Sequence, residues 1–182
     1  MKPFRKSVCV FCGSRAGKAS NFSLTTKKVG RMIAKNGWRL VYGAGDIGLM
    51  GKLADSVLKN NGEVLGVIPK HLLEMEVAKT DLNSLIITEN MHERKKVMFM
   101  NSDTILILPG GIGTLDEFFE ILTWKQLKLH SKDIYILNIN GFWDKLILLL
   151  DHLVIQEFSG SSVHGHYTIL ATLDELDNIL KN

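Results

Sequence analysis

Residues 108–117, Leu-Pro-Gly-Gly-Ile-Gly-Thr-Leu-Asp-Glu, combine residue types that can bind an anion. They follow the apolar run at 104–108 and lead into a helix-like pattern. Glycine lets the main chain approach a bound group closely, and exposed N–H groups at the positive end of a helix attract negative charge. Thr114 adds a hydroxyl group. The turn is therefore predicted to hold an anion, most naturally a phosphate.

Glu117, at the far end of this turn, has two interpretations. In the first, Thr114 and Glu117 form a T-x-x-E capping box, in which the glutamate bonds the amide of the N-cap residue. In the second, Glu117 is a catalytic carboxylate that lies beside the phosphate site and faces a sugar. The spacing alone favours the capping box.

A second charged segment, residues 89–98, places three cations near the start of a helix. Asn90 is the expected N-cap, with a glutamate three residues later, and Arg94, Lys95 and Lys96 follow within two turns. Cations there oppose the helix dipole, at a cost of roughly a few tenths of a kcal/mol each. A solvated basic face suits Lys96. A pocket that receives an anion would compensate the cost for Arg94 and Lys95, and arginine offers a planar fork for phosphate or carboxylate.

Two further glycine turns follow strand-like runs. Residues 13–20 are one residue short of a P-loop, and Ala19 stands where a magnesium-binding hydroxyl belongs, so a ligand contact through Ser14 is favoured over an NTPase. Residues 42–51 contain G-x-G-x-x-G, as in a dinucleotide fingerprint. The acidic residue expected at the end of the next strand, 63–68, is missing. Close helix–sheet packing with some ligand contact is therefore favoured over NAD or NADP binding.

Short apolar runs alternate with longer amphipathic segments along the chain. The runs predict strands at 7–12, 38–42, 63–68, 84–88, 104–108, 134–138 and 167–170. Helices are expected at 21–36, 47–60, 90–101, 114–129, 142–157 and 174–181. Near-continuous apolar strands are typical of a parallel sheet covered on both faces. The pattern predicts a single α/β domain over residues 1–182, a Rossmann-like doubly wound parallel sheet with helices on both faces, whose ligands bind where strands end in loops.

Composition and charge narrow the classes of function. A length of 182 residues suits one domain, and a net charge of +3 without a long basic block indicates neither nucleic acid nor a membrane as partner. No apolar stretch reaches the roughly 18 residues that span a bilayer, and a cytoplasmic location is expected. The odd spacing of Cys9 and Cys12 points them to opposite faces of a strand, which predicts buried free thiols rather than a redox pair or a metal site.

Together these segments resemble the LOG family, the cytokinin riboside 5'-monophosphate phosphoribohydrolases, whose members are often labelled possible lysine decarboxylases. The matching pieces run from VFCGS to LNINGFWDKLILLLD, over roughly residues 7–155, and the last 25 or so residues match little. The pairing of P-G-G-x-G-T-x-x-E with an upstream R-K is specific to the family. The chain departs from the family pattern at Ala44, within a usual glycine triplet, and at Ile112, where an aromatic residue is common.

The resemblance implies a homodimer that hydrolyses the N-glycosidic bond of a nucleoside 5'-monophosphate, AMP or an N6-substituted cytokinin riboside monophosphate, to free base and ribose 5-phosphate. It implies that Arg94 and Glu117 are the catalytic pair. By spacing, Glu76 best matches a further carboxylate of the family's site, with Glu74 close by. Ser14, from the turn at 13–20, is also expected to bind the substrate. The other residues expected to bind it are Glu76, Lys95, Gly110, Gly111, Ile112, Gly113, Thr114, Leu115, Asp116 and Thr123. No metal site is expected, because the six histidines are scattered and only His164 and His166 are close in sequence. No cofactor is expected.

With the resemblance included, the catalytic interpretation of Glu117 is favoured. A carboxylate near the anomeric carbon stabilises an oxocarbenium-like sugar or activates the attacking water. Arg94 would neutralise phosphate or help the base depart.

Two other functions compete with this one. A pyridoxal phosphate decarboxylase needs a Schiff-base lysine, for which no setting is identifiable. A nucleotide carrier or molybdenum cofactor carrier has no need of an Arg94/Glu117 pair, so its presence favours an enzyme.

Overall fold

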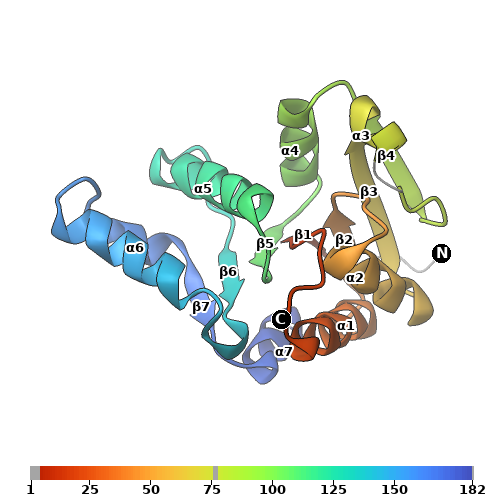
Figure 1. Cartoon of the computed structure of the whole chain (residues 1–182), viewed down its shortest axis with the longest axis horizontal. Helices are drawn as coiled ribbons and strands as arrows, with labels where there is room; N and C mark the ends of the chain where they lie inside the picture. Colours follow the sequence, from red (N-terminus) through yellow and green to blue (C-terminus); the bar gives the residue numbers. More distant parts are fainter. Residues whose placement is uncertain (1–4, 76–77, 182) are drawn as a thin grey trace.

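One parallel sheet forms the centre of the protein. The computed structural model describes residues 5–75 and 78–181 (Figure 1). The seven strands are β1 (Ser7–Phe11), β2 (Arg39–Tyr42), β3 (Glu63–Pro69), β4 (Ser84–Thr88), β5 (Thr104–Ile107), β6 (Ile134–Leu137) and β7 (Thr168–Leu170). Every neighbouring pair is parallel, and each strand begins within one residue of its predicted start. The predicted doubly wound sheet is confirmed.

The helices lie between the strands in the chain, as predicted. They are α1 (Ser20–Lys35), α2 (Gly48–Lys59), α3 (Lys70–Met75), α4 (Met91–Met100), α5 (Ile112–Gln126), α6 (Asp144–Ile155) and α7 (Leu173–Lys181), with 3-10 turns η1 (Ile139–Gly141) and η2 (Ser161–His166). The sequence pattern does not predict α3, because six residues are too few to show a helical period. α5 begins two residues before its predicted start, which matters at the site described below.

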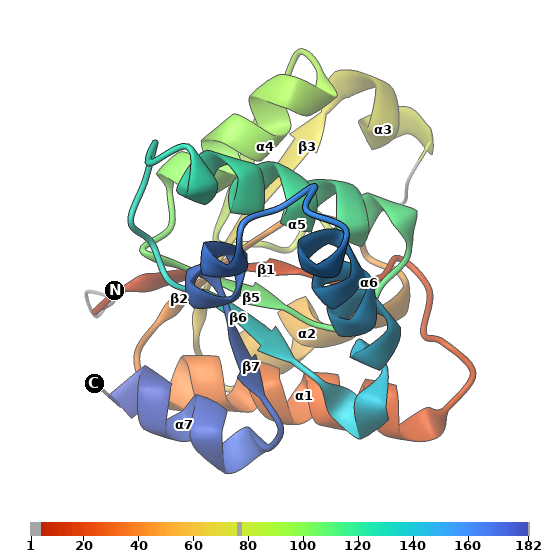
Figure 2. The same cartoon turned by 90° about the vertical axis from the view of Figure 1, so that its left-hand side faces the viewer.

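Helices cover both faces of the sheet and bury two separate cores (Figure 2). α1, α2 and α7 pack on one face, and α4, α5 and α6 pack on the other. Cys12 belongs to the first core and Cys9 to the second, and both are free and buried. The opposite orientation predicted from their odd spacing is confirmed.

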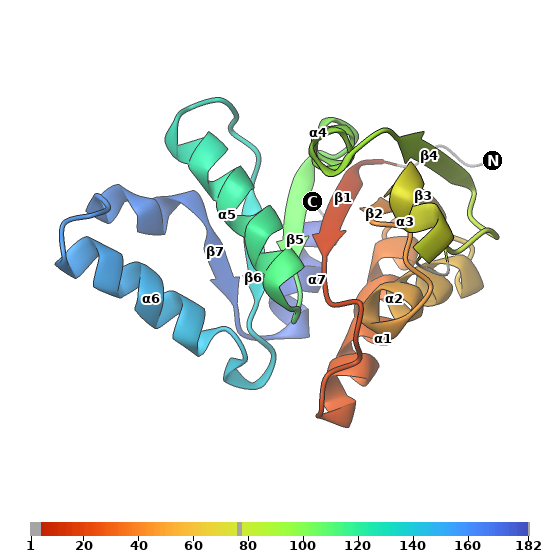
Figure 3. The same cartoon turned by 45° about the horizontal axis from the view of Figure 1, so that its top comes forward.

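The order of the strands creates a switch point at the centre of the sheet. The order is β4-β3-β2-β1-β5-β6-β7, so the chain moves outward from β1 to one edge, returns to β5 beside β1, and continues to the other edge. Figure 3 shows β1 and β5 side by side, and Phe11 is paired with Ile107 near their carboxyl ends. The loops that follow these two strands diverge, and a crevice between diverging loops is where doubly wound folds bind ligands.

Glu157, two residues after the end of α6, has a backbone conformation that suits glycine. Its φ is +60°, and it follows the C-cap residue Gln156 on an exposed turn. Since a left-handed conformation costs a side-chain-bearing residue about 1 kcal/mol, Glu157→Gly is expected to raise the free energy of unfolding by about 1 kcal/mol in urea denaturation. Glu157→Ala removes the same charge but keeps the strained conformation, so an equal gain in that variant would refute the explanation.

Candidate functional site

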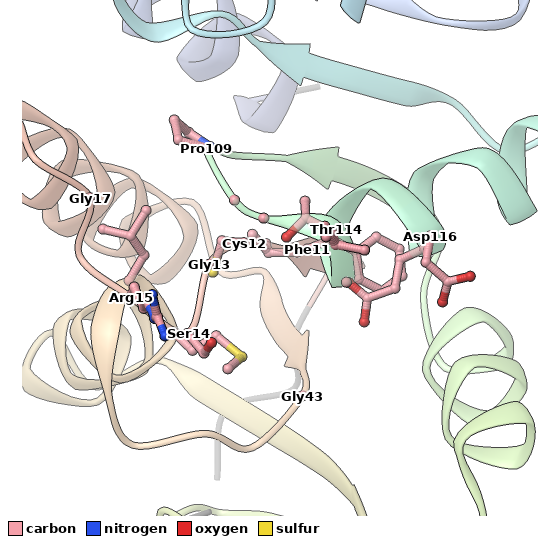
Figure 4. Close-up of a pocket in the computed structure, with 18 of the residues that line it drawn as sticks. Phe11, Cys12, Gly13, Ser14, Arg15, Gly17, Gly43, Pro109, Thr114 and Asp116 are labelled. Carbon is pink, nitrogen blue, oxygen red and sulfur yellow. The ribbon is translucent and has the colours of Figure 1, made fainter.

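A cavity of about 630 Å³ opens at the switch point (Figure 4). Its walls include residues 12–17, which follow β1, and residues 109–114, which follow β5. Figure 4 shows Ser14 and Arg15 on one side and Thr114 and Asp116 on the other. The volume and position are typical of a small-molecule site in a doubly wound fold.

The main chain of the turn after β5 can come close to a ligand in the cavity. The amide of Gly13 donates to the carbonyl of Pro109 (3.0 Å), which ties the two turns together. A side chain on Gly110 would overlap the hydroxyl end of Thr114. Gly111 is the N-cap of α5, and no side chain caps this end of the helix. The first-turn N–H groups of α5 therefore meet the cavity with the partial positive charge that favours an anion.

The capping box predicted for Thr114 and Glu117 is wrong. α5 begins at Ile112, so Thr114 lies in its first turn and Glu117 in its second. Gly111 adopts the extended N-cap conformation (φ −104°, ψ −153°) without a hydroxyl partner, which lets the helix start earlier than the T-x-x-E spacing implies. Glu117 lines the cavity, and within the described part of the chain its carboxyl group bonds no helix end.

Arg94 enters the cavity from α4. Asn90 caps that helix by accepting from the amide of Glu93 (2.9 Å), as predicted. The Arg94 side chain is buried, and its Nε donates to the carbonyl of Val67 (3.1 Å) while its Nη2 donates to the carbonyl of Gly43 (2.6 Å). These bonds to Val67 within β3 and to Gly43 just after β2 fix the guanidinium at the cavity wall. Its remaining N–H groups can bind a ligand anion.

Glu117 is a carboxyl group whose surroundings oppose ionisation. Its pKa is raised to about 8, mainly by burial; Asp116 and Glu120 also raise it, and Arg94 and Lys95 lower it. Among the described residues, Glu117 has no hydrogen bond or ion pair. At neutral pH the side chain is therefore largely protonated in the ligand-free protein, and it can exchange a proton close to physiological pH.

This pKa makes stability depend on pH. The pKa of Glu117 is about 8 in the folded protein and 4.5 without the fold. Between these values only the folded state keeps the proton, so the free energy of unfolding falls as pH rises from about 4.5 to about 8. Because part of the side chain faces the cavity, we expect a loss of about 2 kcal/mol, which Glu117→Gln should abolish. Urea denaturation at about pH 5 and about pH 9 would test this, and parallel losses in both proteins would argue against it.

Lys95 turns away from the cavity toward α5. Its Nζ lies 3.0 Å from Oδ2 of Asp116 and 2.9 Å from Oε2 of Glu120, and the side chain is buried. The two carboxylates raise the pKa of Lys95 although burial lowers it. The ammonium group therefore stays charged and joins α4 to α5.

Comparisons with known proteins show the family of this chain. The family described as "Possible lysine decarboxylase" matches residues 50–181. The probable cytokinin riboside 5'-monophosphate phosphoribohydrolase LOGL1 of Oryza sativa subsp. japonica is 43% identical over 79% of this chain and 65% of its own length. The cytokinin riboside 5'-monophosphate phosphoribohydrolase of Rhodococcoides fascians is 40% identical over 86% of this chain and 80% of its own length. The chain belongs to the LOG family.

Solved structures extend the likeness to more distant proteins. The molybdenum cofactor carrier protein MCP from Chlamydomonas reinhardtii has a TM-score of 0.72 at 20% identity, and the alignment covers 97% of this chain and 96% of that one. Such a low identity shows that the fold is shared and no more.

The family match reaches residue 181, so the expectation that the last 25 or so residues match little is wrong.

The structure brings together most residues that the LOG resemblance assigns to the substrate. Besides Arg94 and Glu117, the cavity is lined by Ser14, Gly110, Gly111, Ile112, Gly113, Thr114 and Asp116. Three others do not line it: Lys95 is paired as above, Leu115 packs on the core, and Thr123 is exposed farther along α5. Glu76 lies outside the described residues, as does the side chain of Glu74.

The cavity also contains residues that the sequence did not single out. Arg15 lies in the turn after β1, and Phe22 and Phe142 form part of the lining. Their rings meet edge to face with centroids 5.4 Å apart, although they are far apart in sequence. Only the fold reveals such a contact, since Phe22 lies outside the matching pieces and Phe142 lies in the distant stretch LNINGFWDKLILLLD.

Two general findings concern the whole described chain. Within residues 5–75 and 78–181, no group of three or more His, Cys, Asp or Glu side chains is arranged to hold a metal ion. No helix in these ranges is long and apolar enough to cross a bilayer.

Proposed function

We propose that this LOG family member hydrolyses the N-glycosidic bond of a nucleoside 5'-monophosphate, either AMP or an N6-substituted cytokinin riboside monophosphate. One observation carries the proposal. Arg94 and Glu117, from different helices, line the same cavity as the uncapped end of α5. The names of the relatives from rice and Rhodococcoides fascians support the same reaction.

The geometry suggests how each part acts. The first-turn amides of α5 and Thr114 bind the 5'-phosphate, which directs the ribose toward Glu117 one turn along the helix. Water attacks C1′ as the bond from C1′ to the base nitrogen breaks, and the bonding electron pair leaves with the base, which takes up a proton. Once Glu117 has lost its own proton, its carboxylate accepts the proton of the water and stabilises positive charge on the sugar.

Arg94 supplies a fixed positive charge in this scheme. Because two of its nitrogens are bonded to the carbonyls of Val67 and Gly43, it needs no reorganisation when charge develops in the cavity. It neutralises the phosphate or assists departure of the base.

The test is to incubate the protein with AMP and with isopentenyladenosine monophosphate and to quantify free base and ribose 5-phosphate. We expect equimolar release of both products, with the ratio of rates identifying the preferred base. Adenosine, which lacks the phosphate, is the matched control and should react far more slowly. If the protein binds AMP but releases no base, the proposed hydrolase is wrong and a nucleotide carrier becomes the better proposal. The molybdenum cofactor carrier protein from Chlamydomonas reinhardtii has the same fold.

We further propose a cytoplasmic homodimer without nucleic acid or membrane partners. Large apolar side chains are exposed on and just after α6, including Leu148 (64%), Ile155 (73%) and Phe158 (86%). Contact with a second copy would remove this surface from water. Light scattering of the purified protein tests the dimer, and a monomer at micromolar concentration would disprove it.

A further inference from the structure

Three acidic residues of α5 lie close to two cations of α4. Asp116 and Glu120 are one turn apart and both pair with Lys95, at 3.0 Å and 2.9 Å from its Nζ. Glu117, between them in sequence, has no ion pair within the described part of the chain. The two cations nearest to Glu117 have other partners. Lys95 pairs with Asp116 and Glu120, and Arg94 donates to two main-chain carbonyls.

The two partners of Lys95 differ in their surroundings. Asp116 is 58% exposed and lines the cavity, where a bound ligand would meet it. Glu120 is 24% exposed and is not part of the cavity lining. A ligand can therefore compete for Asp116, whereas Glu120 keeps its hold on the ammonium group.

We propose that Glu120 is a positioning residue, which holds Lys95 on its own side of α5 and so leaves the carboxyl group of Glu117 unpaired for the reaction. This inference rests on the proposed hydrolysis. Lysine is a flexible point charge that readily changes partners. Without Glu120, its ammonium group would be shared between Asp116 and the adjacent Glu117. An ion pair there would weaken Glu117 as the acceptor of the proton from water.

The charges around Glu117 agree with this role. The titratable groups near it come from α4, α5, β1 and the turn after β1. They are Arg94, Lys95, Asp116, Glu120, Cys9 and Cys12. Burial raises the pKa of both cysteine thiols, which therefore contribute no charge. Neutralising Glu120 removes one influence that raises the pKa of Glu117 and frees Lys95, which lowers it. Both changes act in the same direction.

The experiment compares wild-type protein with Glu120→Gln by two measurements. Carbon-13 NMR titration follows the carboxyl group of Glu117, whose signal is assigned by its disappearance in Glu117→Gln. The pH profile of kcat/KM for AMP is measured in parallel. In Glu120→Gln we expect both midpoints to move down by about one pH unit. On the alkaline plateau, where Glu117 is ionised in both proteins, we expect kcat to fall about 10-fold with KM changed less than about 3-fold.

Repeating the Glu120→Gln comparison in a Lys95→Gln variant tests whether Glu120 acts through Lys95. If Glu120 acts through Lys95, the shift caused by Glu120→Gln should be much smaller once Lys95 is replaced. Glu157→Gln, on the exposed end of α6, changes the net charge equally and should leave both measurements unchanged. Should Glu120→Gln fail to fold, Glu120→Asp, which keeps the charge but shortens its reach, tests the same point.

The proposal is overturned if the titration of Glu117 is the same in wild-type protein and Glu120→Gln, or if the shift is undiminished in the Lys95→Gln background. The NMR titration needs no turnover. Absence of base release from wild-type protein would therefore refute the hydrolase while leaving the effect of Glu120 on Glu117 measurable.

Discussion

We expect the Glu117→Gln variant to release base from AMP roughly 10³-fold more slowly than the wild-type protein. Glutamine has nearly the same shape, but it can neither carry a negative charge beside an oxocarbenium-like sugar nor accept a proton from water. Nucleotide binding should change little, because the phosphate is expected on the amides at the start of α5. A large loss in kcat with a nearly unchanged Kd for AMP is the signature of a group that acts in the transition state.

The control for this variant is Glu157→Gln, which makes the same chemical change on an exposed turn after α6 and should keep full activity. If Glu117→Gln retained more than about a tenth of the wild-type rate, Glu117 would not be the catalytic carboxylate. Asp116, the other carboxylate among the described residues that line the cavity, would then be the residue to replace.

Gly43→Ala is expected to lower kcat/KM roughly 100-fold, although Gly43 has no side chain to offer a substrate. A methyl group at this position would overlap Nη2 of Arg94, which donates to the carbonyl of the same glycine. The guanidinium would have to leave its two carbonyl partners and lose the fixed orientation that the cavity requires. Steady-state kinetics with AMP measure the loss.

The double variant Gly43→Ala/Arg94→Ala separates this cause from others. Because the methyl group acts by displacing Arg94, the double variant should be no less active than Arg94→Ala alone. Gly165→Ala, at a position where an added methyl group meets open space, should be as active as the wild type. An additional loss in the double variant would mean that Gly43 contributes to the site independently of Arg94.

The sequence predicts the sheet almost completely, for a physical reason. A strand buried on both faces is a continuous apolar run, such as SVCVF in β1 or TILI in β5, and such runs end abruptly at polar or glycine turns. The start of α5 is harder to predict. A T-x-x-E pattern satisfies the rule for a capping box, but a glycine at 111 can serve as N-cap without any side chain, so the same residues allow an earlier start.

The site, too, has parts that the sequence predicts and parts that it does not. The turn at 109–114 and the cations of α4 are predictable, because each is a local motif with its own chemistry. The bonds of Arg94 to Val67 and Gly43 are not, since they join residues that only the sheet brings together. The pairing of Lys95 with Glu120 is likewise a property of how α4 packs beside α5.

The first turn of α5 has no side-chain cap, so a bound ligand can take the place of the cap. Every helix needs acceptors for its first N–H groups, and in α4 the side chain of Asn90 supplies one. At Gly111 no side chain serves, so an anion in the cavity would complete the helix as its cap. Affinity for the ligand and order of the first turn of α5 then become one linked equilibrium, in which whatever stiffens the turn tightens binding by the same free energy.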